Sequence, residues 1–236
     1  MASAKIVSIN VASISNGTGV TRKVLFVGDS TINAGWISKY VNDYFAADVM
    51  DITLLGTLSS LGMPHEGRSG WSFADYNSNV KPGNAFWNGT AFDFNHYLTN
   101  SGQTMGAGDW VFIQLGINDL FSASHVFSEA QMNTHIDDMY TDLMNMISSI
   151  HSYNASIRIG VAVTIPPASQ DGIGLALNSA AYDRELYVKK GLSLWWRKLL
   201  QEIDATAMES NRVYLIPTNL LLDTDNNFRT TSQPLD

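Results

Sequence analysis

The sequence contains no cysteine among its 236 residues. This absence excludes disulfide bonds, a thiolate nucleophile and a zinc site with cysteine ligands. It fits a reducing compartment, and it equally fits an extracellular protein that is stabilised by its core alone. The 45% of hydrophobic residues provide enough apolar material for such a core.

Charged residues are also few, at 15% of the chain, against about a quarter in ordinary globular domains. Only 14 residues are basic and 22 are acidic, so the net charge is −8. Because nucleic-acid binding relies on clustered lysine and arginine, this balance predicts no nucleic-acid partner. Aromatic residues reach 11%, which argues against intrinsic disorder.

Long hydrophobic runs are absent as well. No stretch approaches the roughly 18 apolar residues of a membrane span, so no membrane partner is predicted. The first eleven residues hold one lysine and no long apolar run, which does not match a signal peptide, and the compartment stays open between the cytoplasm and a virion or extracellular location. The five histidines show no metal-ligand spacing, so neither a metal nor another cofactor is predicted.

Apolar runs and helical patterns alternate along the chain. Short apolar runs predict five strands, at residues 24–27, 49–55, 110–115, 157–163 and 213–216. Apolar residues at three- and four-residue spacing predict helices at residues 37–45, 129–151 and 180–203. A glycine-rich loop is expected over residues 56–70. This order is typical of an α/β domain with a mostly parallel sheet and helices on both faces.

One domain over residues 23–236 is the simplest interpretation, since the chain has no internal repeat and no low-complexity linker. Residues 1–22 precede this domain. Polar and apolar residues alternate over residues 5–12, which predicts either an additional edge strand or an extended arm.

The informative polar residues follow the first three predicted strands. The segments in question are Gly28-Asp29-Ser30, Ser69-Gly70 and Gly116-Ile117-Asn118-Asp119. Sites form at the carboxyl ends of parallel strands, so these segments should meet. A serine on a strand-to-helix turn is a candidate nucleophile. The amide of Asn118 and the backbone N–H of Gly70 are donors of the kind that an oxyanion hole needs.

These three segments, in this order, resemble the first three sequence blocks of the SGNH (GDSL-like) hydrolases. One such triplet is a weak signal, but three in order at strand ends are specific. The resemblance implies a flavodoxin-like three-layer α/β/α fold with five parallel strands. It also implies that Ser30 is the nucleophile of a serine esterase. The oxyanion hole would consist of the backbone N–H groups of Ser30 and Gly70 and the Nδ2 of Asn118.

The fourth block of the family, Asp-x-x-His, is matched only in part. In this block the histidine is the general base and the aspartate orients it. Asp236 stands where the aspartate is expected, but neither the histidine nor the closing helix of the family follows it. Three interpretations stay open. The chain is a fragment or processed product whose missing segment continues in the parent gene or lies in another polypeptide, or His65 or His125 serves as the base, or catalysis has been lost.

The resemblance implies hydrolysis of small O-acyl esters, such as acetyl, on carbohydrate. Trp71, helped by Trp36, is a candidate for contact with a sugar. The aromatic residues of segment 86–97 should cover a small core of their own, and the alternative is that they form a sugar-stacking wall. Residues 92–97 resemble an insert of some bacterial and phage members. The carboxylates of Asp29 and Asp119 should make local hydrogen bonds that shape their turns.

The alternative to an esterase is a non-catalytic carbohydrate-binding or structural module, for example in a phage tail or cell-surface assembly. A third possibility, a lipase-like enzyme for long acyl chains, would require an apolar channel. His135 and His151 fall on a predicted helix, where solvent-facing or helix-end positions are expected for them.

Overall fold

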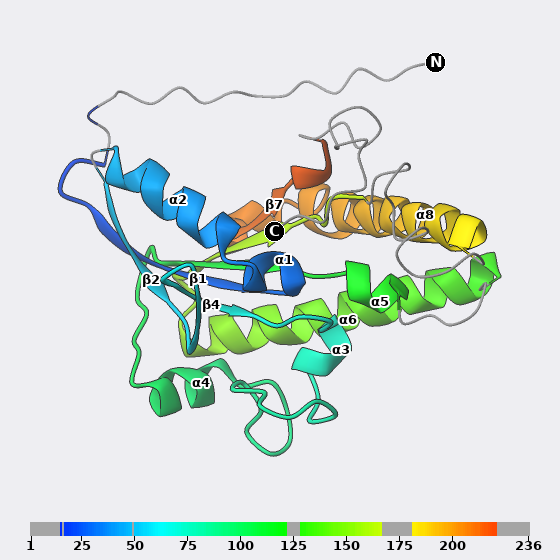
Figure 1. Ribbon diagram of the computed structural model, residues 1–236, viewed down its shortest axis with the longest axis horizontal. Helices are drawn as coiled ribbons and strands as arrows, with labels where there is room; N and C mark the ends of the chain where they lie inside the picture. Colours follow the sequence, from blue (N-terminus) through cyan, green and yellow to red (C-terminus); the bar gives the residue numbers. More distant parts are fainter. Residues whose placement is uncertain (1–14, 16, 49, 122–127, 167–180, 221–236) are drawn as a thin grey trace.

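The computed structural model describes residues 15, 17–48, 50–121, 128–166 and 181–220 (Figure 1). The strands are β1 (Thr21–Gly28), β2 (Asp51–Leu55), β3 (Leu58–Ser60), β4 (Met63–Gly67), β5 (Trp110–Gln114), β6 (Arg158–Ala162) and β7 (Val213–Ile216). The α-helices are α1 (Ser30–Asn33), α2 (Trp36–Ala46), α3 (Phe73–Tyr76), α4 (Phe94–Ser101), α5 (Ile117–Phe121), α6 (Glu129–Tyr153) and α8 (Ala181–Leu199). Three short turns are a π-helical turn at Leu200–Asp204 and 3₁₀ turns at Met208–Asn211 and Thr218–Leu220.

The sheet is mostly parallel and follows the order β3-β4-β1-β5-β6-β7, with β2 also paired to β1. The first half of β1 pairs with β2 and its last two residues pair with β4, so these two strands share one edge of β1. Counting them as one position leaves five parallel positions in the order of a flavodoxin-like sheet. The predicted α/β class, with its mostly parallel sheet, is therefore confirmed.

The predicted count of five strands and the predicted loop over residues 56–70 are wrong in detail. That segment forms β3 and β4, an antiparallel hairpin in which Ser60 pairs with Met63. Its two-residue turn places Leu61 at φ 51° and Gly62 at φ 76°. Positive φ at both central residues is the geometry that matches the twist of a hairpin, although leucine rarely adopts it.

Helices cover both faces of the sheet, with α2 on one side and α6 on the other (Figure 1). Successive side chains of β1 alternate between two apolar clusters. Leu25 and Val27 belong to the larger cluster, which includes residues of α6 and α8. Val24 and Phe26 belong to a smaller cluster, against which residues of α2 pack. The position of α1 at the end of β1 places the candidate nucleophile at the rim between these layers.

Most predicted boundaries agree with the structure within a few residues. The long helix α6 spans 25 residues, and β7 matches its predicted range. The helix predicted to reach residue 203 ends as α8 at Leu199 and continues as the π-helical turn. β1 begins at Thr21, so the domain boundary predicted at residue 23 falls inside this strand, whereas the predicted arm lies outside the described residues. No helix within the described ranges is long and apolar enough to cross a membrane.

Candidate active site

Ser30 lies where the sequence places a nucleophile, at the first residue of α1, directly after β1 and the N-cap Asp29. Its side chain is exposed, and its Oγ has no hydrogen-bond partner within the described part of the chain. The turn needs glycine at its base, because a Cβ on Gly28 would lie 2.4 Å from Ile32 Cγ1 and 2.7 Å from the carbonyl oxygen of Gln114. The close approach of β5 to α1 therefore depends on Gly28.

Asp29 shapes the turn as predicted. Its Oδ1 accepts hydrogen bonds from the N–H of Thr31 at 2.8 Å and from the Oγ1 of Thr31 at 2.7 Å. Burial raises the pKa of Asp29, while the two bonds from Thr31 lower it. Gln114 Nε2 in turn donates to Thr31 Oγ1 at 3.2 Å, which ties the nucleophile turn to the end of β5.

The loop after β4 is brought to the same edge of the sheet by backbone contacts. Gly67 pairs with Gly28, and the N–H of Arg68 donates to the carbonyl oxygen of Gly28 at 2.8 Å. A Cβ on Gly67 would lie only 2.3 Å from the backbone nitrogen of Asn33. The hydroxyl of Tyr76 donates to the carbonyl oxygens of Gly28 and Glu66. The end of β1 and the loop after β4, which carries the candidate donor Gly70 and is called the donor loop, are thus joined by several hydrogen bonds.

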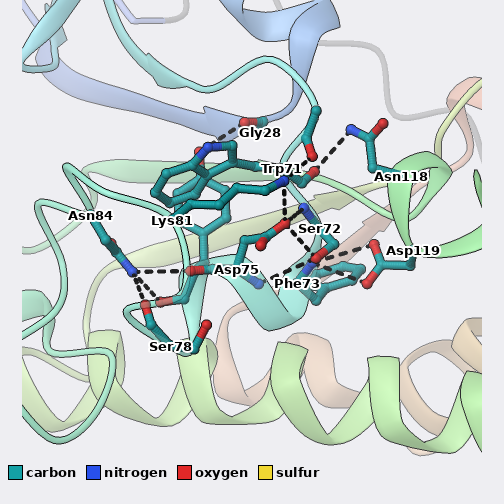
Figure 2. Close-up of polar contacts among 12 residues, drawn as sticks. Gly28, Trp71, Ser72, Phe73, Asp75, Ser78, Lys81, Asn84, Asn118 and Asp119 are labelled. Atoms are coloured by element: carbon teal, nitrogen blue, oxygen red, sulfur yellow. Dashed lines mark hydrogen bonds and ion pairs between the residues drawn. The ribbon is translucent and has the colours of Figure 1, made fainter. Parts of the chain in front are cut away.

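Gly70, the predicted backbone donor, lies in this loop at φ 75° and is exposed. No heavy atom lies within 4 Å of a Cβ built there, so glycine serves the backbone conformation and not the space. Lys81 Nζ donates to the carbonyl oxygen of Gly70 and forms an ion pair with Asp75 at 2.9 Å (Figure 2). Asp75 also accepts from the N–H of Ser72 at 2.8 Å, in a capping box of α3. Sequence reasoning did not single out Lys81.

Two successive residues of α5, the short helix that follows β5, form hydrogen bonds with the segment that follows Gly70 (Figure 2). Asn118 Nδ2 donates to the carbonyl oxygen of Trp71 at 2.9 Å. The carboxylate of Asp119 accepts from the N–H of Phe73 at 3.1 and 3.3 Å. A primary amide carries two N–H donors, so the bond to Trp71 orients Asn118 and leaves a second hydrogen for an oxyanion.

The carboxylate of Asp119 makes the predicted local contact, with its own backbone N–H, and in addition reaches Phe73, which is 46 positions away in the sequence. Burial raises the pKa of Asp119 to about 7, while the hydrogen bond from the N–H of Phe73 opposes the shift. His135 differs from its expected solvent-facing position, because its Nε2 lies 2.9 Å from the backbone oxygen of Asp119. Both side chains therefore support the segment that carries Asn118.

The candidate bases do not meet Ser30 among the described residues. His65 lies inside β4 and not on a loop as predicted, and its side chain is fully buried. Its Nδ1 accepts a hydrogen bond from the N–H of Gly67 at 3.0 Å, and burial lowers its pKa, so its neutral form is favoured. His125 and Asp236 lie outside the described residues. Within the described ranges, no group of three or more His, Asp or Glu side chains could hold a metal ion.

Trp71 lies next to the donor loop but exposes only 7% of its surface. Its ring packs edge-on against Tyr76 at 5.0 Å, and the Arg68 guanidinium lies 4.9 Å from its centroid. Trp36 at the start of α2 is 47% exposed and stacks on Tyr40 at 5.7 Å. Little of Trp71 is therefore accessible for the predicted sugar contact, whereas about half of Trp36 is.

The prediction that the aromatic segment before β5 covers a small core of its own is wrong, because Phe86, Phe92 and Tyr97 belong to the same buried cluster as Leu25 and Val27 of β1. Phe86 stacks on Phe92 at 4.7 Å and on Tyr97 at 4.3 Å, and all three are buried. Phe86 also meets Tyr76 edge-on at 6.0 Å. The aromatic segment therefore packs against α3, the helix that follows the loop carrying Gly70.

A scan against protein-family models finds no match, and neither does a search of curated protein sequences. Among solved structures, this chain is similar to a Streptococcus pneumonia protein described as a platelet activating factor, with 15% identity, a TM-score of 0.50, and coverage of 89% of this chain and 72% of that chain. It is also similar to a gut microbial diltiazem-metabolizing enzyme, with 13% identity, a TM-score of 0.52, and coverage of 86% of this chain and 38% of that chain. A Clostridium thermocellum family 3 carbohydrate esterase aligns at 20% identity and a TM-score of 0.48 over 88% of this chain and 82% of that chain. At these identities the likeness concerns the fold alone.

Proposed function

We propose that this chain is an SGNH-type serine hydrolase domain that cleaves small O-acyl esters, above all O-acetyl esters, on carbohydrate. One observation carries the proposal: the three blocks recognised in the sequence converge. Arg68 N–H binds the strand end that precedes Ser30, and Asn118 binds the carbonyl of Trp71, next to Gly70. A nucleophile and two oxyanion donors are then held on one edge of the sheet.

In the proposed reaction, the Oγ of Ser30 attacks the ester carbonyl and loses its proton to a general base. The tetrahedral oxyanion accepts hydrogen bonds from the N–H groups of Ser30 and Gly70 and from Nδ2 of Asn118. Collapse releases the sugar hydroxyl, which takes up the proton, and leaves an acyl-serine. Water then attacks the acyl-serine and releases the carboxylate, which restores Ser30.

The base is the open part of this proposal. No histidine follows His151 in the sequence, so the histidine of the fourth family block is not matched. We propose that another polypeptide or a longer form of the chain supplies it and that Asp236 orients it. Without a base, serine remains a weak nucleophile, and turnover relies on the oxyanion donors and on binding.

The carbohydrate part of the proposal rests on the family resemblance and on Trp36. The exposed Trp36–Tyr40 stack lies at the start of α2, and Trp36 is six residues after Ser30 in the sequence. Flat aromatic faces of this kind bind apolar faces of small molecules with little loss of side-chain freedom. Acetylated xylo-oligosaccharide is therefore the first substrate to test.

The test is acetate release from p-nitrophenyl acetate and from acetylated xylo-oligosaccharide, with and without added imidazole as a diffusible base. We expect slow turnover that imidazole accelerates and that Ser30→Ala abolishes, whereas Ser59→Ala on the exposed face of β3 leaves it unchanged. Imidazole alone hydrolyses p-nitrophenyl acetate, so the enzyme-free rate at each imidazole concentration is subtracted. Turnover above that rate that survives Ser30→Ala would disprove the nucleophile assignment.

A non-catalytic carbohydrate-binding module is the second candidate, favoured by the lack of a described base at Ser30. It predicts that acetylated oligosaccharide binds to this chain with the same affinity before and after Ser30→Ala. It also predicts no acetate release, even with imidazole, which separates the two proposals in the same experiment.

A further inference from the structure

A second, apolar site lies on the face of the sheet that carries α2. A cavity of about 930 Å³ opens there, lined by apolar side chains of α2 and of the strands β1, β2, β5 and β6. Because side chains two positions apart on a strand share a face, Val24 and Phe26 project together into it. Trp110 and Phe112 of β5 stand beside them in register, and the rings of Phe26 and Phe112 stack at 5.3 Å. Ser30 does not line this cavity.

The charge of the cavity is concentrated at one end. Arg22 and Arg158 are its only charged lining residues within the described part of the chain. Arg22 lies one pleat before Val24, and Arg158 pairs with Trp110, so both mark the amino-terminal end of the strands. Neither guanidinium has a carboxylate partner among the described residues, although the chain carries a net charge of −8. The Arg22 guanidinium donates to the carbonyl oxygen of Thr21, and that of Arg158 lies over the ring of Trp110, so neither positive charge is neutralised by these contacts. Two such guanidinium groups at the mouth of an apolar cavity favour an anion.

The other end of the cavity is neutral. Ile32 of α1 and Gln114 of β5 lie there, and the amide of Gln114 is engaged by Thr31. Gln114 is level with Gly28, six positions along β1 from Arg22, which corresponds to about 20 Å at the rise of a strand. The cavity is therefore elongated, cationic at one end and apolar along its length. Ligand sites of about 300–1,000 Å³ with an apolar lining and a few polar groups are common in proteins.

From this arrangement we infer that the cavity binds a single-chain anionic amphiphile, with a fatty-acid carboxylate at Arg22 and Arg158 and the alkyl chain along Phe26 and Phe112. Guanidinium groups bind carboxylates through paired N–H donors, and the alkyl chain gains free energy with each methylene that leaves water. The charge at one end and the narrow apolar length select a long anionic chain over a compact or cationic ligand. The site is independent of the proposed esterase function.

The test is calorimetric titration of the full chain with decanoate, dodecanoate and dodecyltrimethylammonium, each below its critical micelle concentration. We expect dodecanoate to bind about fifteenfold more tightly than decanoate, because each methylene contributes about fourfold. The cationic amphiphile should bind at least tenfold more weakly than dodecanoate. Equal affinity for the anionic and cationic chains would overturn the assignment.

Variants separate the two ends of the site. The double variant Arg22→Gln, Arg158→Gln should weaken dodecanoate binding about tenfold, whereas Arg197→Gln on the exposed part of α8 should not change it. Val41→Trp, which adds a ring from α2 to the cavity, should abolish binding without lowering the melting temperature. A double variant that binds as tightly as the wild type contradicts the proposal.

The same experiment distinguishes other occupants and the esterase proposal. Light scattering that shows a dimer, dissociated by Val41→Glu and indifferent to dodecanoate, would assign the cavity to a second copy of the chain and overturn the proposal. Ser30→Ala should bind dodecanoate normally. Loss of esterase activity with dodecanoate binding retained therefore leaves this site standing.

Discussion

The donor half and the base half of the candidate active site are built very differently. On the donor side, the loop that carries Gly70 is fixed from β1 by Arg68 N–H, from α5 by Asn118 and Asp119, and from outside by Lys81. On the base side, no described histidine contacts Ser30. The Nδ1 of His65 instead accepts a hydrogen bond from the N–H of Gly67, in the same strand. The proposed oxyanion donors are thus held by several contacts, whereas no contact between a base and Ser30 is found within the described part of the chain.

This difference has a consequence for rate. Oxyanion donors that are fixed in advance retain value without a working base, and hydrolases that lack a triad member keep about 10³–10⁴-fold acceleration over water. The chain should therefore behave as a slow esterase that responds to an added base. Substitutions on the donor side should then reduce the rate far more than substitutions at His65.

The largest effect is expected for Asn118→Ala. Removal of one oxyanion donor typically lowers kcat by about 10²–10³-fold, and KM should change little because the bond strengthens in the transition state. The measurement is turnover of p-nitrophenyl acetate in the presence of imidazole. Asn145→Ala, an exposed residue of α6, is the matched control. An unchanged kcat would remove Asn118 from the oxyanion hole.

The buried carboxyl of Asp119, which accepts a hydrogen bond from the N–H of Phe73, should make the free energy of unfolding depend on pH. Burial raises the pKa of folded Asp119 from 3.8 to about 7, so the unfolded chain releases this proton first. The stabilisation by the neutral carboxyl is complete below pH about 4 and declines as the pH rises to about 7, by at most about 1.4 kcal/mol per pH unit.

Urea unfolding of the wild type and of Asp119→Asn between pH 4.5 and 8 measures this effect. We expect the stability of the wild type relative to the variant to decline over this interval. Asp29, whose pKa burial also raises, is present in both proteins and cancels in the difference, whereas the repulsion between Asp142 and Asp119 is part of the effect that is measured. A constant difference across the interval would show that Asp119 is ionised throughout.

Much of the fold could be predicted because its strands are apolar on both faces. β5, β6 and β7 are runs of this kind, and they were placed within one or two residues. The β3–β4 hairpin was missed for two physical reasons. Pro64, His65 and Glu66 give β4 no apolar pattern, and the Leu61-Gly62 turn lacks the Asn-Gly or Asp-Gly signal of hairpins.

The candidate site divides in the same way. Glycine, serine and asparagine at strand ends are visible in a sequence, so the blocks around Ser30, Gly70 and Asn118 could be found. The support for them could not be found, because the partners of Lys81 and Asp119 include the backbone of Gly70 and Phe73, and backbone groups carry no sequence signal. Only the folded chain reveals which residues fix the donors.

Lys81 offers a smaller test of the donor half. Lys81→Met removes the bond to the Gly70 carbonyl and the ion pair with Asp75, both partly exposed, so we expect kcat to fall about fivefold, or about 1 kcal/mol. KM and the melting temperature should change little, and Lys81→Arg should restore part of the rate. Lys39→Met, which breaks only the surface pair with Asp43, should leave kcat unchanged. A fall in melting temperature that accounts for the lost activity would reduce Lys81 to a structural role.

The smallest effect on rate is expected at His65, which makes it the sharpest test of the base half. His65 is buried, its Nδ1 is occupied by the N–H of Gly67, and burial favours its neutral form. His65→Gln keeps an acceptor for Gly67, so kcat should stay within about twofold while the stability falls by about 1 kcal/mol. The comparison is made with and without imidazole. If His65→Gln lowered kcat more than tenfold and imidazole restored it, His65 would be the base, and both halves of the site would belong to this chain.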